Sequence, residues 1–117
     1  MRPNLNVEGI PLDVVNMVQY QESSVISREL YVKGAGTITI FAFDKDQGLS
    51  EHSAPFDAFV FILDGEAKVS IAGEWKELKR GQLLLMPANV PHAVQAVTPF
   101  KMLLLMFRET AKKAPLF

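Results

Sequence analysis

The sequence contains no cysteine, so neither a disulfide framework nor a thiolate metal site is available to it. A chain without disulfides suits a reducing compartment, and we expect a cytoplasmic protein. Long apolar runs are missing as well, since even Met102–Phe107 is far shorter than the ~20 residues that span a membrane. The opening stretch MRPNLNVEGIPLDVV lacks the apolar segment of a secretory signal, so we expect no signal and no membrane partner.

Charge of one sign does not dominate the chain. The 12 Lys and Arg residues and 13 Asp and Glu residues are scattered and give a formal net charge of −1. Without a basic stripe to follow a phosphate backbone, we expect no nucleic-acid partner. The 117 residues, of which 49% are hydrophobic, are enough for one domain with one core.

Helix signals are few, and turn signals are frequent. The seven prolines argue against long helices, and only Pro11–Tyr20 has a helical pattern. Turn signals such as Asp64-Gly65, Ala72-Gly73 and Thr98-Pro99 recur every ~8–16 residues, with short β-branched, aromatic and leucine-rich runs between them. This pattern predicts an all-β sandwich or barrel.

The apolar runs between the turns mark the expected strands. Asp64-Gly65 predicts a type I′ turn, in which both central residues have a positive φ. Leu83–Met86 and Met102–Phe107 are continuously apolar, which predicts strands buried on both sides. At a sheet edge Met102–Phe107 would promote aggregation, so we expect it to be central or covered by a second subunit. The predicted strands are Val25–Lys33, Thr37–Phe43, Phe59–Leu63, Ala67–Ile71, Trp75–Leu78, Leu83–Met86 and Met102–Phe107.

Two stretches carry a resemblance to a known family. The first contains Gly48, His52 and Gly65, and the second, GQLLLMPANVPHAV, contains Gly81, Pro87, Asn89 and His92. They resemble the two motifs of the cupin superfamily, in particular the small single-domain cupins of bacteria, which have G-x5-H-x-H-x3,4-E-x6-G and G-x5-P-x-G-x2-H-x3-N. Asn89 takes a glycine position of the second motif, and asparagine is the next residue to tolerate a positive φ.

The resemblance implies an antiparallel jelly-roll barrel of six to eight strands. We expect the barrel to span residues 25–108, between an N-terminal segment (1–24), irregular or briefly helical, and a C-terminal tail (109–117). The resemblance also implies a homodimer with exchanged N-terminal strands, for which Val25–Val32 is the candidate.

The resemblance assigns four metal ligands to such a barrel, and this chain retains two of them. His52 and His92 match the first and last histidines, whereas Ala54 and Ala58 replace the second histidine and the glutamate. Three imidazoles and a carboxylate would suit Zn, Fe, Mn, Ni or Cu. Asp57, one residue from the glutamate position, and Gln95, three after His92, are candidates to complete a site with His52 and His92.

Several functions stay open at this stage. We expect a barrel of undefined activity that binds a metal or a small molecule at its mouth through His52 and His92. The Phe, Trp and Met residues, including Met86, Met102 and Met106, would line a small apolar pocket if some of them face the mouth. One alternative is a metal-dependent dioxygenase or isomerase with a reduced ligand set.

Two further alternatives involve no metal. In an epimerase-like acid/base enzyme, His52 would be paired with Asp57 or Glu51, since imidazole titrates near neutral pH. In the other alternative, the two histidines only hydrogen-bond to each other or to water.

Overall fold

The structure is a computed structural model that describes residues 7–108. Those residues form nine strands and a single 3-10 turn, η1 (Val14–Asn16). The all-β prediction is confirmed, and no helix in this part of the chain has the length and apolar character to cross a membrane. The strands are β1 (Val25–Lys33), β2 (Gly36–Phe43), β3 (Gly48–His52), β4 (Asp57–Asp64), β5 (Glu66–Ile71), β6 (Glu74–Lys79), β7 (Leu83–Met86), β8 (His92–Ala96) and β9 (Phe100–Phe107).

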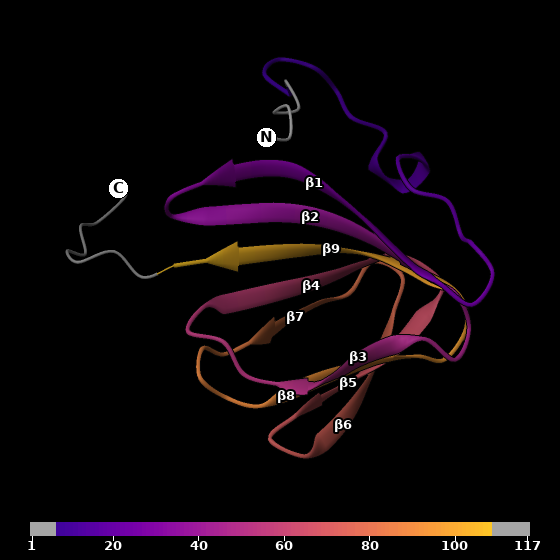
Figure 1. Cartoon of the computed structure of the whole chain (residues 1–117), viewed down its shortest axis with the longest axis vertical. Helices are drawn as coiled ribbons and strands as arrows, with labels where there is room; N and C mark the ends of the chain where they lie inside the picture. The colour runs from indigo at the N-terminus through magenta and orange to yellow at the C-terminus, as the bar shows by residue number, and fades with distance from the viewer. Residues whose placement is uncertain (1–6, 109–117) are drawn as a thin grey trace.

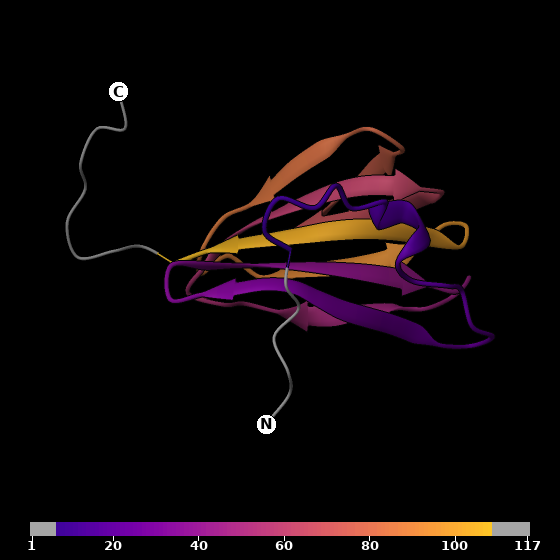
Figure 2. The same ribbon diagram turned by 90° about the horizontal axis from the view of Figure 1, so that it is seen from above.

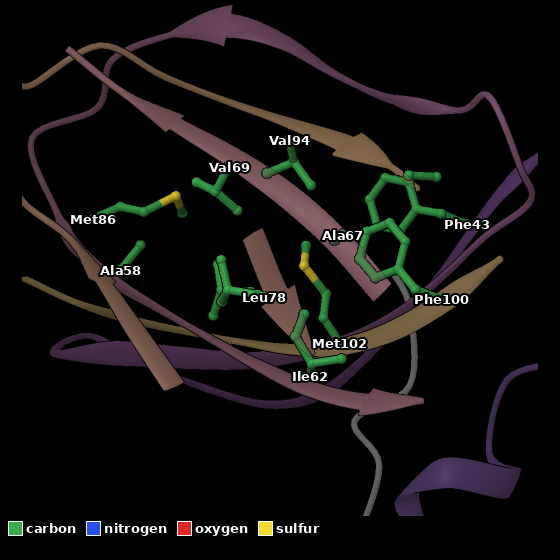
Figure 3. Packing of buried hydrophobic residues seen from close by; sticks show 12 residues of the cluster. Phe43, Ala58, Ile62, Ala67, Val69, Leu78, Met86, Val94, Phe100 and Met102 are labelled. Atoms are coloured by element: carbon green, nitrogen blue, oxygen red, sulfur yellow. The ribbon is translucent and has the colours of Figure 1, made fainter. Parts of the chain in front are cut away.

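Two antiparallel sheets face each other, as expected for a jelly-roll barrel (Figure 1). The larger sheet has the order β1-β2-β9-β4-β7, and the smaller has the order β3-β8-β5-β6. The core lies between them, because alternate side chains of each strand point inward. Figure 3 shows it filled from both sides by residues such as Val69, Val94 and Met102, and the Phe43 and Phe100 rings stack with centroids 4.5 Å apart.

The turn at Asp64-Gly65 differs from its prediction. Only Gly65 has a positive φ (74°), and the strands on either side, β4 and β5, belong to different sheets. The turn therefore carries the chain from one sheet to the other and does not close a hairpin. The two positive φ values of a type I′ turn occur at Ala72 (52°) and Gly73 (85°), where β5 pairs with β6.

The two leucine-rich strands also behave differently from each other. β9 lies between β2 and β4, which confirms that Met102–Phe107 is central. The prediction of burial on both sides is wrong for Leu83–Met86, because β7 is an edge strand. Leu83 and Leu85 point away from the core and are 58% and 41% exposed, whereas Met86 points inward and is buried.

The segment before β1 packs on the outer face of the larger sheet, which Figure 2 shows from above. Of the two alternatives left open for this segment, irregular or briefly helical, the structure has an irregular path with the short 3-10 turn η1. The buried Lys101 holds the segment there by donating a hydrogen bond to the Val15 carbonyl at 2.6 Å. Tyr20 Oη donates to Asp64 Oδ2 at 2.6 Å, and burial together with this bond raises the pKa of Tyr20. The segment therefore does not enter the space between the sheets, which contains the core and the site.

Candidate functional site

The two histidines of the chain lie opposite each other in the smaller sheet. His52 ends β3, His92 begins β8, and the two residues are direct partners in the antiparallel register. Because paired residues point to the same face of a sheet, the rings meet. Their centroids are 4.5 Å apart, in an edge-to-face arrangement with planes at 69°. Positions forty apart in the sequence therefore share one face of the sheet.

The backbone fixes the tautomer of each ring. His52 Nδ1 lies 2.8 Å from the Ser50 carbonyl oxygen, and His92 Nδ1 lies 3.2 Å from the Val90 carbonyl oxygen. A carbonyl oxygen only accepts, so each Nδ1 carries the proton and donates it. In the neutral ring this leaves Nε2 with an unshared electron pair. Metal-binding histidines are commonly oriented by this type of Nδ1–H bond.

The two rings differ in exposure. His52 is exposed, whereas His92 is buried at 5% exposure. Burial lowers the pKa of His92 below its usual value of 6.5, and the nearby His52 lowers it further against the opposing effect of the Val90 carbonyl. The unprotonated, ligand-competent form of His92 is therefore favoured at neutral pH.

This lowering has a measurable consequence. We expect the ring protons of His92 to titrate in an NMR pH series with a midpoint below 6.5. Because the unfolded chain binds this proton more readily, the contribution of His92 to stability is present above pH 6.5. It is lost as the pH falls toward the folded-state pKa. A His92 midpoint at or above 6.5 would contradict the assignment.

A cavity opens beside the histidine pair, between the two sheets. It is small, with a volume of about 50 Å³. Apart from His52 and His92, no residue of its lining has an acidic or basic side chain. The other lining residues are Leu49, Ala54, Phe56, Ala58, Met86, Val94, Met102, Leu104 and Met106.

All four positions of the ligand set implied by the motifs line this one cavity. His52 and His92 contribute imidazoles, and Ala54 and Ala58 contribute only methyl groups. His52 and Ala54, two residues apart, thus face the same cavity. The geometry of a four-ligand site remains, and half of its ligands are missing.

Asp57 lies outside the cavity. Its Oδ1 accepts a hydrogen bond of 2.9 Å from the Ala88 backbone N–H. One residue further along, the Asn89 N–H donates to the Ala54 carbonyl at 2.7 Å, and Asn89 has the positive φ (64°) predicted for it. Asp57 therefore ties the loop before β4 to the loop before β8, and these loops carry the two motifs.

Gln95 and Glu51 also lie away from the histidines. Both line a shallow hollow on the outer face of the smaller sheet, together with Trp75. The reason is strand parity: His92, Val94 and Ala96 are buried on the inner face, so Gln95, an odd number of residues from His92, points outward. The structure thus brings His52 and His92 together and separates them from Gln95 and Asp57.

The thioethers of the cavity are absent from the predicted ligand candidates. Met86, Met102 and Met106 all line it, although the sequence suggested only that some methionines would provide apolar surface. Alternation along Met102–Phe107 could have predicted two of them, because residues 102, 104 and 106 share the inward face of the strand. Met86 is the residue directly before Pro87 of the second motif.

Comparison with known proteins identifies the family. The family model described as "Cupin domain" matches residues 39–107, more than half of the chain. The chain belongs to the cupin family. A search of the curated proteins finds no match to this cupin.

Solved structures of other cupin-fold proteins are similar to this cupin. A conserved protein of unknown function from Streptococcus pyogenes is 36% identical, with a TM-score of 0.85 over 94% of this chain and 98% of that one. A cupin 2 conserved barrel domain protein from Leptotrichia buccalis is 39% identical, with a TM-score of 0.81 over 83% and 47%. A cupin superfamily protein from Desulfitobacterium hafniense is 28% identical, with a TM-score of 0.82 over 92% and 97%.

The side chains of this cupin do not fit the divalent ion that the motif set would hold. Ala54 and Ala58 offer no donor atom, and no carboxylate lines the cavity. Within residues 7–108 there is no group of three or more His, Asp or Glu side chains arranged to hold a metal ion. A 2+ charge in this apolar space would be left without a neutralising anion, which is unfavourable.

Proposed function

We propose that this cupin is a binding protein whose ligand is held by the Nε2 atoms of His52 and His92. The observation that carries the proposal is the fixed tautomer of both rings beside one cavity. Each Nδ1–H is bonded to a backbone carbonyl, so each neutral ring offers its other nitrogen as an electron-pair donor. A ligand for this pair is an electron-pair acceptor, either a metal ion or a proton-donating group.

The cavity supports binding over catalysis. Its lining, apart from the two imidazoles, is entirely apolar, which is typical of small-molecule sites with a few polar anchors. An epimerase-like mechanism needs a carboxylate beside His52, and neither Asp57 nor Glu51 lines the cavity. A metal-dependent dioxygenase or isomerase needs an ion with open positions, and the two alanines remove the ligands that would hold it.

The proposal is tested by NMR on the untagged protein with three named probes: Zn(II), Cu(I) and phenol. The chain has two histidines, so a ¹⁵N spectrum of the imidazole rings holds only the signals under test. We expect at least one probe to shift both Nε2 signals and to raise the melting temperature. The His52→Ala and His92→Ala variants should lose that rise.

The Asp57 carboxylate supplies a control. An Asp57→Asn variant changes a residue near the mouth that does not line the cavity, so it should keep the probe-induced rise in melting temperature. If none of the three probes shifts either Nε2 signal of the native protein, the proposed function is wrong.

A further inference from the structure

We infer that the ligand of this site is a soft monovalent metal ion, Cu(I), coordinated by His52 and His92 together with the thioethers of Met86 and Met106. The inference rests on the proposed function, because it uses the same two Nε2 atoms. It departs from the divalent ion of the motif set, which the residues present do not fit. It starts from what surrounds Ala58, where that set has its glutamate.

The strand register places two methionines on either side of Ala58. Ala58 of β4 is the direct partner of Met86 on β7 and of Met106 on β9. Residues directly opposite in antiparallel strands share a face, so Met86, Ala58 and Met106 form a row on the inner face of the larger sheet. Figure 3 shows Met86 beside Ala58, with its side chain extending into the space between the sheets. Two sulfur atoms thus flank the position where a carboxylate is missing.

The row lies across the cavity from the histidine pair. Met86 and Met106 come from the larger sheet, His52 and His92 come from the smaller, and all four line the same cavity. Facing sheets pack about 10 Å apart, a gap that an imidazole and a methionine can span with one ion between them. Methionine is long and unbranched, so its sulfur adjusts to the ion at low cost.

The chemistry of these ligands selects the ion. Thioethers are soft ligands that favour Cu(I), whereas carboxylate and water suit the harder divalent ions. Every ligand in this set is neutral, and the rest of the lining carries no charge. A 1+ ion loses less hydration energy than a 2+ ion on entering such a space, so the lack of a carboxylate is tolerated for Cu(I).

The test is an anaerobic competition for Cu(I) against bicinchoninic acid, with ascorbate as reductant. The native protein should remove Cu(I) from the chelator. The double variant Met86→Leu with Met106→Leu should bind it about 100-fold more weakly, a loss at the upper end of that seen for supporting residues of metal sites. Ag(I), a redox-inert soft ion, should likewise bind more tightly to the native protein than to the double variant. Weak Zn(II) binding should be unchanged in the double variant, since thioethers contribute little to it.

Two controls separate ligand loss from structural damage. Met17 belongs to the segment that packs on the outer face of the larger sheet, so its thioether lies outside the cavity. Met17→Leu should therefore leave Cu(I) affinity unchanged. X-ray absorption of the Cu(I)-loaded native protein should show sulfur as well as nitrogen neighbours, whatever the stability of the leucine variant.

The outcomes distinguish this inference from the proposed function. If His52→Ala and His92→Ala abolish Cu(I) binding but the leucine double variant keeps it, or if no sulfur neighbour is seen, the thioether inference is wrong and binding at the histidines stands. If the native protein takes no Cu(I) from the chelator but phenol or Zn(II) shifts the Nε2 signals, the Cu(I) inference is again wrong and binding at the histidines again stands. If Cu(I) binds equally to the histidine variants, the Cu(I) inference is wrong, and if in addition none of the three probes shifts an Nε2 signal, the proposed function is wrong as well.

Discussion

Replacing Gly65 by alanine is expected to lower the free energy of unfolding by about 3–5 kcal/mol, much of the 5–15 kcal/mol of a typical domain. Gly65 has a φ of +74°, which costs a residue with a Cβ atom about 1–2 kcal/mol. An added Cβ would also overlap the Pro99 carbonyl oxygen and lie 2.9 Å from Phe100 Cα. Both are backbone atoms, so the β4–β5 crossing and the start of β9 would have to separate.

The matched control for Gly65 is Gly73. It also has a positive φ (+85°), but an added Cβ there meets nothing within 4 Å. Gly73→Ala should therefore lower the free energy of unfolding only by the cost of the positive φ, about 1–2 kcal/mol. Thermal unfolding of the two variants measures the difference, which isolates the steric clash and should exceed about 5 °C in melting temperature. Equal melting temperatures would contradict the close packing of the crossing against Pro99.

The strands were predictable because their signals are local. Alternation and turn residues decide where a strand runs, and β1 and β7 have the bounds expected of them. Partner choice is not local, however. Asp64-Gly65 has the sequence of a hairpin turn, yet it crosses between sheets, where Gly65 packs against Pro99 and against Phe100, the first residue of the distant β9. The exposure of Leu83 and Leu85 was missed for the same reason, since only the sheet order makes β7 an edge.

The sequence predicted the histidine pair of the site but not the residues that surround it. The convergence of His52 and His92 follows from two motifs that resemble known ones. Gln95 was assigned to the pocket against its own parity with His92, and Asp57 was assigned from closeness in sequence. Met86 and Met106 lie beside Ala58 only through strand register, which a single sequence does not reveal.

Restoring the two missing side chains should convert the cavity into a site for divalent ions. In the double variant Ala54→His with Ala58→Glu, three imidazoles and a carboxylate would line the space that now holds two imidazoles. We expect Zn(II) to bind at least about 100-fold more tightly than to the native protein, since a carboxylate both coordinates and neutralises the ion. Calorimetric titration of both proteins measures this gain. A folded double variant with native Zn(II) affinity would show that the four positions do not converge on one ion.

The single variant Ala58→Glu tests the same geometry without metal. Position 58 is 4% exposed, and its row is apolar, so an introduced carboxylate is buried without a partner and its pKa is raised above the usual 4.3. The folded state then binds the proton more tightly than the unfolded chain, so stability is lost as the pH rises from about 4 toward the raised folded-state pKa. Ala58→Gln adds nearly the same volume without the charge, so its stability relative to the native protein should not change over that pH range. Zn(II) should rescue Ala58→Glu at pH 7 and leave Ala58→Gln unaffected, because only a carboxylate can offset the charge of an ion held by His52 and His92.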